Sequence, residues 1–366
     1  MPPRYMQWFQ ANYPKVKLDK SPSNKYVLQL LRGLQGDKSI GRKWYLLLKD
    51  ILTKFGFYQC VEEPALYYYC KNDAKFILNT STDDFLCAYT HQETFESLCE
   101  YFKEFFSITT ETGTTLNYLN LRIIQTSYGI SYDQTDHIQR KIINKHFPPS
   151  KIEGTQLKSV HTPFRTDSQF EIDLLETLPA NAEQLKLLEE QHGASYASII
   201  GDIMHVYVWS RPDVGYSTTR LSRYIHAPSS PSFMGLKRIL RYLATHTHRP
   251  IMYPRASIDG IHTIRVDFDT PKFEEIELPN SLIALVDSDH ARDNNTRRSC
   301  HCVLVLLAGV VVDWKMQQQR VVALHSTDSE IRGALQATKQ GLTLQHICKH
   351  IGMKPTHYIP LRNRRG

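Results

Sequence analysis

The sequence predicts an α+β fold in which sheet-forming and helical segments alternate in blocks. Residues 65–89 carry aromatic and β-branched runs broken by turn-forming residues. Residues 195–245 carry apolar side chains at helical spacing, and residues 281–350 have three β-rich runs followed by one long helical pattern. Strands followed by a helix are typical of a small α+β or α/β module, which we expect at the C-terminal end.

The composition is that of a globular protein. The chain has 366 residues, 41% of them hydrophobic and 22% charged, which is enough for two or three domains. No apolar run is long enough to cross a bilayer, and the N-terminal "MPPRYMQWFQ" lacks the apolar core of a signal peptide. We therefore expect an intracellular protein that is not secreted and has no membrane partner.

The seven cysteines are scattered and do not suggest a disulfide framework. Two short segments, "SCHC" (299–302) and "HICKH" (346–350), contain metal-ligand residue types. Neither has the spacing of a structural zinc site, although His346 and His350 lie one helical turn apart. We interpret both segments as packing residues.

The net charge of +7 permits a polyanionic partner but does not require one. Positive charge gathers in "LKRILRYLATHTHRP" (236–250) and in the tail from residue 349. Basic faces are usually solvated surface, so this clustering is a weak indication of nucleic-acid binding.

The first 147 residues predict helices and hairpins in alternation. Gly56 ends the first helix and Gly129 lies at the bend of the last hairpin, while Thr135 is expected to cap the helix after it. The expected ranges are a helix at 42–55, strands at 65–70 and 75–80, a helix at 92–106, a hairpin at 116–134 and a helix at 135–147.

The remainder begins with a polar, irregular stretch from Pro148 to about Glu189, which we interpret as a linker. A second connector is expected at 250–280, where no periodic pattern is evident. The other expected elements are helices at 195–209, 215–226 and 237–243, strands at 281–289, 302–309 and 310–315, and a long helix at 327–350.

Two adjacent aspartates, Asp83 and Asp84, interrupt the strand-like stretch "FILNTSTDDFLCAYT" (76–90). Aspartates are depleted in strands, and neighbouring carboxylates repel each other. One interpretation is an ordinary hairpin turn formed by "TSTDD". The other adds a hard divalent cation such as Mg²⁺ at the tip, which would offset the repulsion. The dipeptide alone does not decide between them.

A second acidic group lies in "ALVDSDHARD" (284–293), where Asp287 and Asp289 end a β-rich run and Asp293 follows. Asp328 and Glu330 lie near the start of the long helix, where acids also favour the helix dipole. The functional interpretation is that Asp287 and Glu330 meet at a divalent cation, as carboxylates do in two-metal phosphoryl-transfer sites.

At this point six segments, which follow one another as in the family, resemble copia-type long-terminal-repeat retrotransposon Pol polyproteins. "STDD" (81–84) is similar to the family's "YVDD", and "LQGDKSIGRKW" (34–44) to "LYGLKQAPRxW". "YLNLRIIQTSYGISYDQTDHI" (118–138) resembles "FLGxxI…GIxxxQxxYI", and 199–245 resembles "VGSLLYLxxxTRPDIAYAVxxLSRF…AAKRILRYLxGT". The RNase H portion follows, with "ALVDSDHARDNNTRRSC" (284–300) similar to "YxDADWAGDxxxRRSTS" and 311–335 similar to "ISWxSxKQxxVALSSTEAEYxAL".

This resemblance implies a partial reverse-transcriptase palm at 1–147, with the start of the thumb. The palm would be followed by a linker and helical thumb or connection region at 148–249, a connector at 250–280 and a truncated RNase H-like domain at 281–366. It implies Mg²⁺ or Mn²⁺ as cofactor, with RNA, DNA or RNA–DNA hybrid and deoxynucleotides as partners. The implied catalytic and metal-binding residues are Asp83, Asp84, Asp287 and Glu330; Gln35, Gly36 and Lys38 would bind nucleotide; Arg42, Lys237, Arg238 and Arg241 would bind nucleic acid.

The sequence departs from the family pattern at both ends. The family's upstream palm aspartate has no counterpart, since Asp19 and Asp37 lack its context, and residues 331–366 contain no Asp or Glu for the last RNase H acid. Ser81 and Asn120 replace a tyrosine and a glycine of the pattern, and Asp202 lies in an otherwise apolar helix. We therefore expect a fragment or decayed copy of an RNA-directed DNA polymerase and RNase H, catalytically impaired. The alternatives are a non-catalytic nucleic-acid-binding remnant that uses the basic helix, and an unselected remnant that folds poorly.

Overall fold

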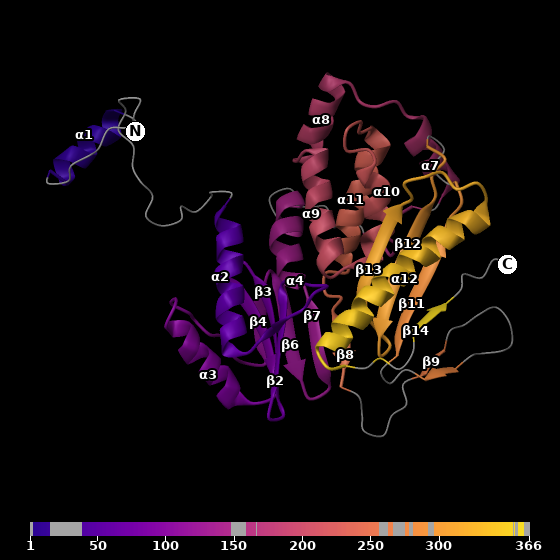
Figure 1. Cartoon of the computed structure of the whole chain (residues 1–366). Helices are drawn as coiled ribbons and strands as arrows, with labels where there is room; N and C mark the ends of the chain where they lie inside the picture. Colours follow the sequence, from indigo (N-terminus) through magenta and orange to yellow (C-terminus); the bar gives the residue numbers. More distant parts are fainter. Residues whose placement is uncertain are drawn as a thin grey trace. The chain divides into compact units, whose positions relative to one another are not determined.

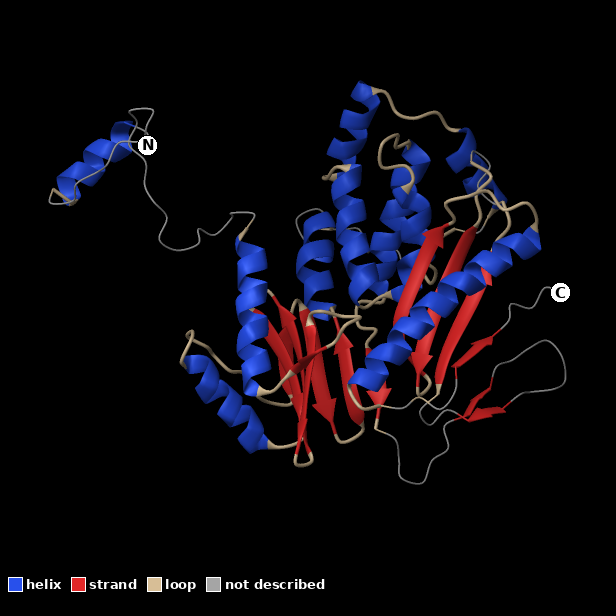
Figure 2. Ribbon diagram, in the orientation of Figure 1, coloured by secondary structure: helices blue, strands red, loops and turns tan. Residues whose placement is uncertain are grey.

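The computed structural model describes residues 3–14, 39–147, 159–165, 167–255, 263–265, 275–277, 281–291, 296–353, 355 and 358–361. The chain divides into two compact units, which are described separately: Met1–Gln59 with Pro64–Glu104, and Cys60–Glu63 with Phe105–Gly366. Both units mix helices and strands, which confirms the α+β class (Figures 1 and 2). Within the described ranges, no helix is long and apolar enough to span a membrane.

The first unit is an antiparallel sheet with two helices on one face. The strands lie in the order β1-β2-β3-β4. Its elements are α1 (Pro3–Asn12), α2 (Ile40–Phe55), β1 (Tyr58–Gln59), β2 (Leu66–Lys71), β3 (Ala74–Ser81), β4 (Asp84–Tyr89) and α3 (Gln92–Lys103).

Aromatic side chains hold α2 and α3 against the same face of this sheet. Phe76 of β3 and Tyr89 of β4 are paired across the strands, so they share a face. Phe95 of α3 stacks on Tyr89, and Phe57, just after α2, meets Phe76 edge-on with ring centroids 5.4 Å apart. Phe57 and Phe76 are almost fully buried, so this face forms the core of the unit.

The second unit begins with an antiparallel sheet in the order β5-β6-β7-β8 and a block of helices. The helical core contains apolar residues from α7, α9, α10 and α11. The strands are β5 (Thr115–Tyr118), β6 (Leu121–Thr126), β7 (Gly129–Asp133) and β8 (Ile251–Pro254). The helices are α4 (Thr135–His137), the π-helical η1 (Ile138–Ile143), α5 (Asn144–His146), α7 (Ser168–Glu176), α8 (Ala182–His192), α9 (Tyr196–Trp209), the 3₁₀ η2 (Pro212–Val214), α10 (Gly215–Ser222) and α11 (Ser230–Thr245).

Three expectations for this unit were wrong. The stretch interpreted as a linker contains α7 and most of α8, whose N-termini are capped by the side chains of Asp167 and Asn181. The connector expected at 250–280 contributes β8, which pairs with β7. Thr135 is the first residue of α4 and makes no side-chain cap; instead its backbone N–H donates to the Asp133 carboxylate at 2.8 Å.

The C-terminal part of the second unit is a sheet in the order β13-β12-β11-β14, with α12 packed on one face. The expected strands and long helix are confirmed. β14 runs parallel to β11, whereas β12 is antiparallel to both of its neighbours, β11 and β13. The elements are β9 (Thr263–Arg265) and β10 (Glu275–Glu277), which pair with each other, then β11 (Leu282–Ser288), β12 (Cys300–Leu307), β13 (Val310–Gln318), α12 (Ser326–His350) and β14 (Tyr358–Leu361).

The helical block and this sheet are joined through Tyr207 of α9. The indole N–H of Trp314 donates to the Tyr207 carbonyl at 2.9 Å, and the Met316 backbone N–H donates to the Tyr207 hydroxyl at 2.8 Å. Gly215 lies so close to the Tyr207 ring that an added Cβ would be 2.5 Å from Cε2. The packing therefore requires the absence of a side chain at residue 215.

A buried ionic network at "SRPDV" stabilises the helical block. Arg211, only 2% exposed, makes two hydrogen bonds to the Asp213 carboxylate and a third to the His246 carbonyl. The hydroxyl of Tyr242 also donates to Asp213, at 2.8 Å. Burial acts to raise the pKa of Asp213, but these donors, led by Arg211, outweigh it and lower that pKa. The segment resembling the family's "TRPD" therefore has a structural role.

Candidate functional site

Asp83 and Asp84 lie at the tip of the β3–β4 hairpin. Ser81 pairs with Asp84, so the turn consists of two residues, Thr82 and Asp83, rather than the five-residue loop expected. Thr82 has φ +54°, which is unfavourable for a β-branched residue. Both aspartates are exposed. Asp84 lies five residues before Tyr89 on β4, so its side chain is on the sheet face opposite α2 and α3, because side chains alternate along a strand.

Trp44 of α2 fixes the backbone of this tip. Its indole N–H donates to the Thr82 carbonyl oxygen, with 2.5 Å between Nε1 and O. Trp44 was singled out within a sequence motif, but nothing in the sequence indicated this contact across 38 residues. Arg42 lies on the same helix and is exposed. The predicted nucleotide-binding residues Gln35, Gly36 and Lys38 lie outside the described residues.

Strand alternation separates Asp287 from the helix that carries Glu330. Gly333 of α12 lies against Val286 and Ser288 of β11, so those side chains face α12. Asp287, between them, projects to the other face, and its cross-strand partner is Cys302. Glu330 is half-buried near the start of α12. Asp287 therefore lies on the sheet face away from α12, and a cation site shared by Asp287 and Glu330 stays a prediction.

Two other acids of this region have structural partners. The Asp289 carboxylate accepts the backbone N–H of Cys300, and its carbonyl accepts the Ser329 hydroxyl. The Asp328 carboxylate accepts the Leu324 backbone N–H and pairs with Arg332 at 2.9 Å, which lowers the pKa of Asp328. Asp293 lies outside the described residues.

The basic residues expected to grip nucleic acid lie on α11, whose apolar face is deep in the helical core. Lys237, Arg238 and Arg241 are half-buried rather than fully exposed. Arg238 donates two hydrogen bonds to Thr162, at 3.0 Å to its carbonyl and 2.8 Å to its hydroxyl. Two of the N–H donors of Arg238 are therefore already used in hydrogen bonds within the protein.

Asp202, which looked misplaced in an apolar helix, is paired. Its carboxylate lies 2.5 Å from the Lys145 ammonium and 3.0 Å from His146 Nε2. Burial opposes ionisation, but His146 and Lys145 together lower the pKa of Asp202. This pairing removes one sequence argument for a poorly folded remnant.

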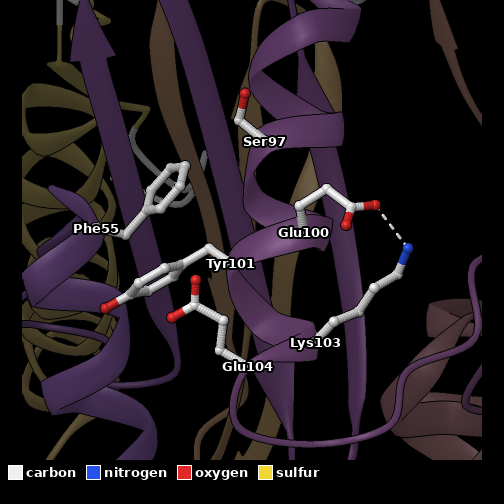
Figure 3. A pocket seen from close by; sticks show the side chains of 6 residues that line it. All are labelled: Phe55, Ser97, Glu100, Tyr101, Lys103 and Glu104. Carbon is white, nitrogen blue, oxygen red and sulfur yellow. Dashed lines mark hydrogen bonds and ion pairs between the residues drawn. The ribbon is translucent and has the colours of Figure 1, made fainter.

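A hollow of about 630 Å³ lies between the end of α2 and α3, lined by Phe55, Ser97, Glu100, Tyr101, Lys103 and Glu104. Figure 3 shows the ion pair between Glu100 and Lys103 at its edge, with the Tyr101 ring beside Phe55. Its lining contains none of the residues predicted from the sequence, so we assign no function to it.

Comparison with known proteins gives relatives that include several transposon-encoded polyproteins. The chain is 23% identical over 336 residues to the Retrovirus-related Pol polyprotein from transposon RE1 of Arabidopsis thaliana, covering 92% of this chain and 20% of that protein. It is 22% identical over 336 residues to the Pol polyprotein from transposon TNT 1-94 of Nicotiana tabacum, covering 91% of this chain and 23% of the relative. The putative transposon Ty5-1 protein of Saccharomyces cerevisiae is 23% identical over 307 residues, covering 83% of this chain and 86% of the relative.

The chain thus spans about a fifth of the length of the polyproteins RE1 and TNT 1-94 that it matches. No protein-family model matches it, and no solved structure matches it. The similarity to these relatives extends over most of the chain and agrees with the motifs quoted from the sequence. The chain is therefore a retrotransposon Pol-like protein, as those motifs predicted.

Proposed function

We propose that this chain is a section of a retrotransposon RNA-directed DNA polymerase with an RNase H-like module, and that its Asp83–Asp84 hairpin binds Mg²⁺ or Mn²⁺. Its partners would be RNA, DNA or their hybrid, with deoxynucleotides as ancestral substrates. The proposal rests on the hairpin: two adjacent exposed carboxylates at a two-residue turn, with the backbone of that turn held by Trp44.

The donor set fits a hard divalent cation. Mg²⁺ prefers carboxylate oxygens and usually retains several waters, and the exposure of Asp83 and Asp84 leaves space for both. A cation bound there would neutralise charge on a transferring phosphoryl group. The contribution of the protein is to hold two carboxylates at a fixed position, with Asp84 on the sheet face that α2 and α3 leave uncovered.

Turnover by residues 1–366 alone is expected to be absent. The hairpin supplies two carboxylates, whereas phosphoryl transfer depends on metals held by a larger set at correct positions. The topology of β11–β14 and α12 supports an RNase H-like module, but Asp287 faces away from α12. We therefore assign cation binding to the hairpin and expect no hybrid cleavage.

The experiment is a Mn²⁺ titration of isotope-labelled protein, followed by paramagnetic broadening of backbone amide signals. Signals of residues 81–85 should broaden first in the unmodified chain and should remain sharp in the Asp83→Asn, Asp84→Asn double variant. Asp73→Asn is the matched control, because Asp73 lies in the β2–β3 turn of the same sheet. Broadening centred elsewhere, or unchanged in the double variant, would contradict the proposal.

Primer-extension and hybrid-cleavage assays on the same samples test the expectation that residues 1–366 alone show no turnover. We expect neither activity in the unmodified chain. Mg²⁺-dependent extension that disappears in the double variant would show that two hairpin carboxylates suffice. The alternative of a non-catalytic nucleic-acid-binding remnant is less well supported, because Arg238 is engaged with Thr162.

A further inference from the structure

Four ligand-type side chains that are far apart in the sequence gather at the C-terminal end of α12. Cys60, Glu62 and His350 each place one ligand atom within 4.8 Å of the other two. The segment Cys60–Glu63 belongs to the second unit, as does α12. His346 lies one helical turn before His350, so both imidazoles project from the same side of the helix.

The separations are close to the edge lengths of a tetrahedral metal site. The Cys60 sulfur lies 3.5 Å from Glu62 Oε2 and 3.8 Å from His350 Nδ1, and Glu62 Oε2 lies 2.9 Å from His350 Nδ1. Zinc bonds of about 2.0–2.3 Å at tetrahedral angles place ligand atoms about 3.3–3.6 Å apart. Small side-chain shifts would bring all three atoms into coordination. His346 Nδ1 lies 3.4 Å from the other Glu62 oxygen, Oε1.

The chemistry of the set favours zinc over magnesium or calcium. A thiolate, two imidazole nitrogens and one carboxylate oxygen form a borderline-soft set, whereas magnesium and calcium select oxygen ligands. Cys60 is only 1% exposed, so its sulfur points into the protein beside Glu62 rather than to solvent. Glu62 and the histidines are partly exposed, which leaves a route for a metal to enter.

We propose that Cys60, Glu62 and His350 bind Zn²⁺, with His346 as the fourth ligand. Binding would convert the Cys60 thiol to a thiolate and release its proton to solvent. The metal would tie the Cys60–Glu63 segment to α12 across 290 residues of sequence. The role is structural, since four protein ligands would leave no open position for a substrate. This zinc site does not depend on the function proposed for the Asp83–Asp84 hairpin.

Co²⁺ is the probe for this site, because a cobalt–thiolate bond gives a charge-transfer band and tetrahedral Co²⁺ absorbs strongly in the visible range. Protein stripped with a chelator should bind one equivalent with both signals, and Zn²⁺ should displace it. Cys60→Ser should abolish the charge-transfer band. Cys70→Ser, which changes an exposed cysteine, should retain it.

Affinity measurements identify the remaining ligands. Glu62→Gln and His350→Gln should each weaken Zn²⁺ binding by at least about tenfold, while the neighbouring Glu63→Gln should not. Zn²⁺ should raise the melting temperature of the unmodified chain but not that of Cys60→Ser. If Cys60→Ser does not fold, the Zn²⁺ affinities of Glu62→Gln and His350→Gln still test the proposal, because both residues are partly exposed.

Three results would overturn the proposal. The first two are the absence of a thiolate band in the unmodified chain and a band that persists in Cys60→Ser. Unchanged affinity in both Glu62→Gln and His350→Gln would have the same effect, and the cluster would then be only an ion pair between Glu62 and two histidines. Unchanged affinity in His346→Gln alone would remove His346 from the site and leave the three-ligand assignment intact.

Discussion

The indole N–H of Trp44 donates to the carbonyl oxygen of Thr82, the residue directly before Asp83. Thr82 has a positive φ, a conformation that costs of order 1–3 kcal/mol for a non-glycine residue and persists only where neighbours hold it. Trp44 is therefore a positioning residue for the carboxylates, although it does not touch the atoms they would bind.

Trp44→Phe removes this donor and keeps most of the apolar volume. We expect faster amide hydrogen exchange at residues 81–85, since the turn loses its hydrogen bond from α2, and a small loss of overall stability of about 0.5–1.5 kcal/mol. Tyr45→Phe, at an exposed tyrosine of the same helix, serves as the control. Equal exchange in the two variants would mean that Trp44 does not hold the turn.

Asp213→Asn should be strongly destabilising. Arg211 would keep its buried charge without a charged partner, and removing one member of a buried ion pair typically costs about 3–5 kcal/mol. Urea unfolding followed by circular dichroism measures this loss. Glu176→Gln, at an exposed glutamate of α7, should change stability by less than about 0.5 kcal/mol. A similar effect of both substitutions would show that the network contributes little.

Acid should destabilise the second unit through Asp202 and Asp213. The folded-state pKa of each carboxyl is lowered, so its contribution is complete above the unfolded-state pKa of about 3.9 and is lost as the pH falls through the folded value. We expect stability to be flat with respect to these two groups from pH 7 to about 5 and to fall below about pH 4. The Asp202→Asn variant should lose less stability over the same acidic interval, and parallel curves would contradict the assignment.

Gly215→Ala tests the close approach of α10 to Tyr207. The added methyl group would push the ring that joins α9 to β13, and overpacking of this kind costs about 1–3 kcal/mol. Gly201→Ala, on α9, is the matched control, because a Cβ there meets nothing within 4 Å. That substitution should stabilise the helix by up to about 1 kcal/mol. Thermal unfolding of the two variants should therefore shift in opposite directions.

Much of the fold could be predicted from the sequence because its signals are local. The apolar spacing in α2 and α12 and the alternating runs of β3 and β11 each lie within a few residues. The helices α7 and α8 were missed because α8 has no fully buried residue and its polar composition resembles a linker. Their capping residues, Asp167 and Asn181, were the signal that could have indicated them.

The site was less predictable because it depends on contacts between distant residues. The hairpin at Asp83 follows from local turn chemistry, but the Trp44 contact does not. Asp287 and Glu330 were expected to converge, and only the register of β11 against α12 shows which face Asp287 occupies. His346 and His350 looked like packing residues, because Glu62 lies almost 300 residues away in sequence.

The pairing of β7 with β8 has a consequence for chain topology. Tyr132 and Ile251 are cross-strand partners, so the segment between them leaves and re-enters the sheet at adjacent positions. The whole helical block is thus an insertion whose two ends lie side by side. This insertion, here called the cassette, could be excised and replaced by a short loop without breaking the four-stranded sheet. Excision would uncover Trp314 and Met316 on β13, so a soluble cassette-free chain would need polar residues at those two positions.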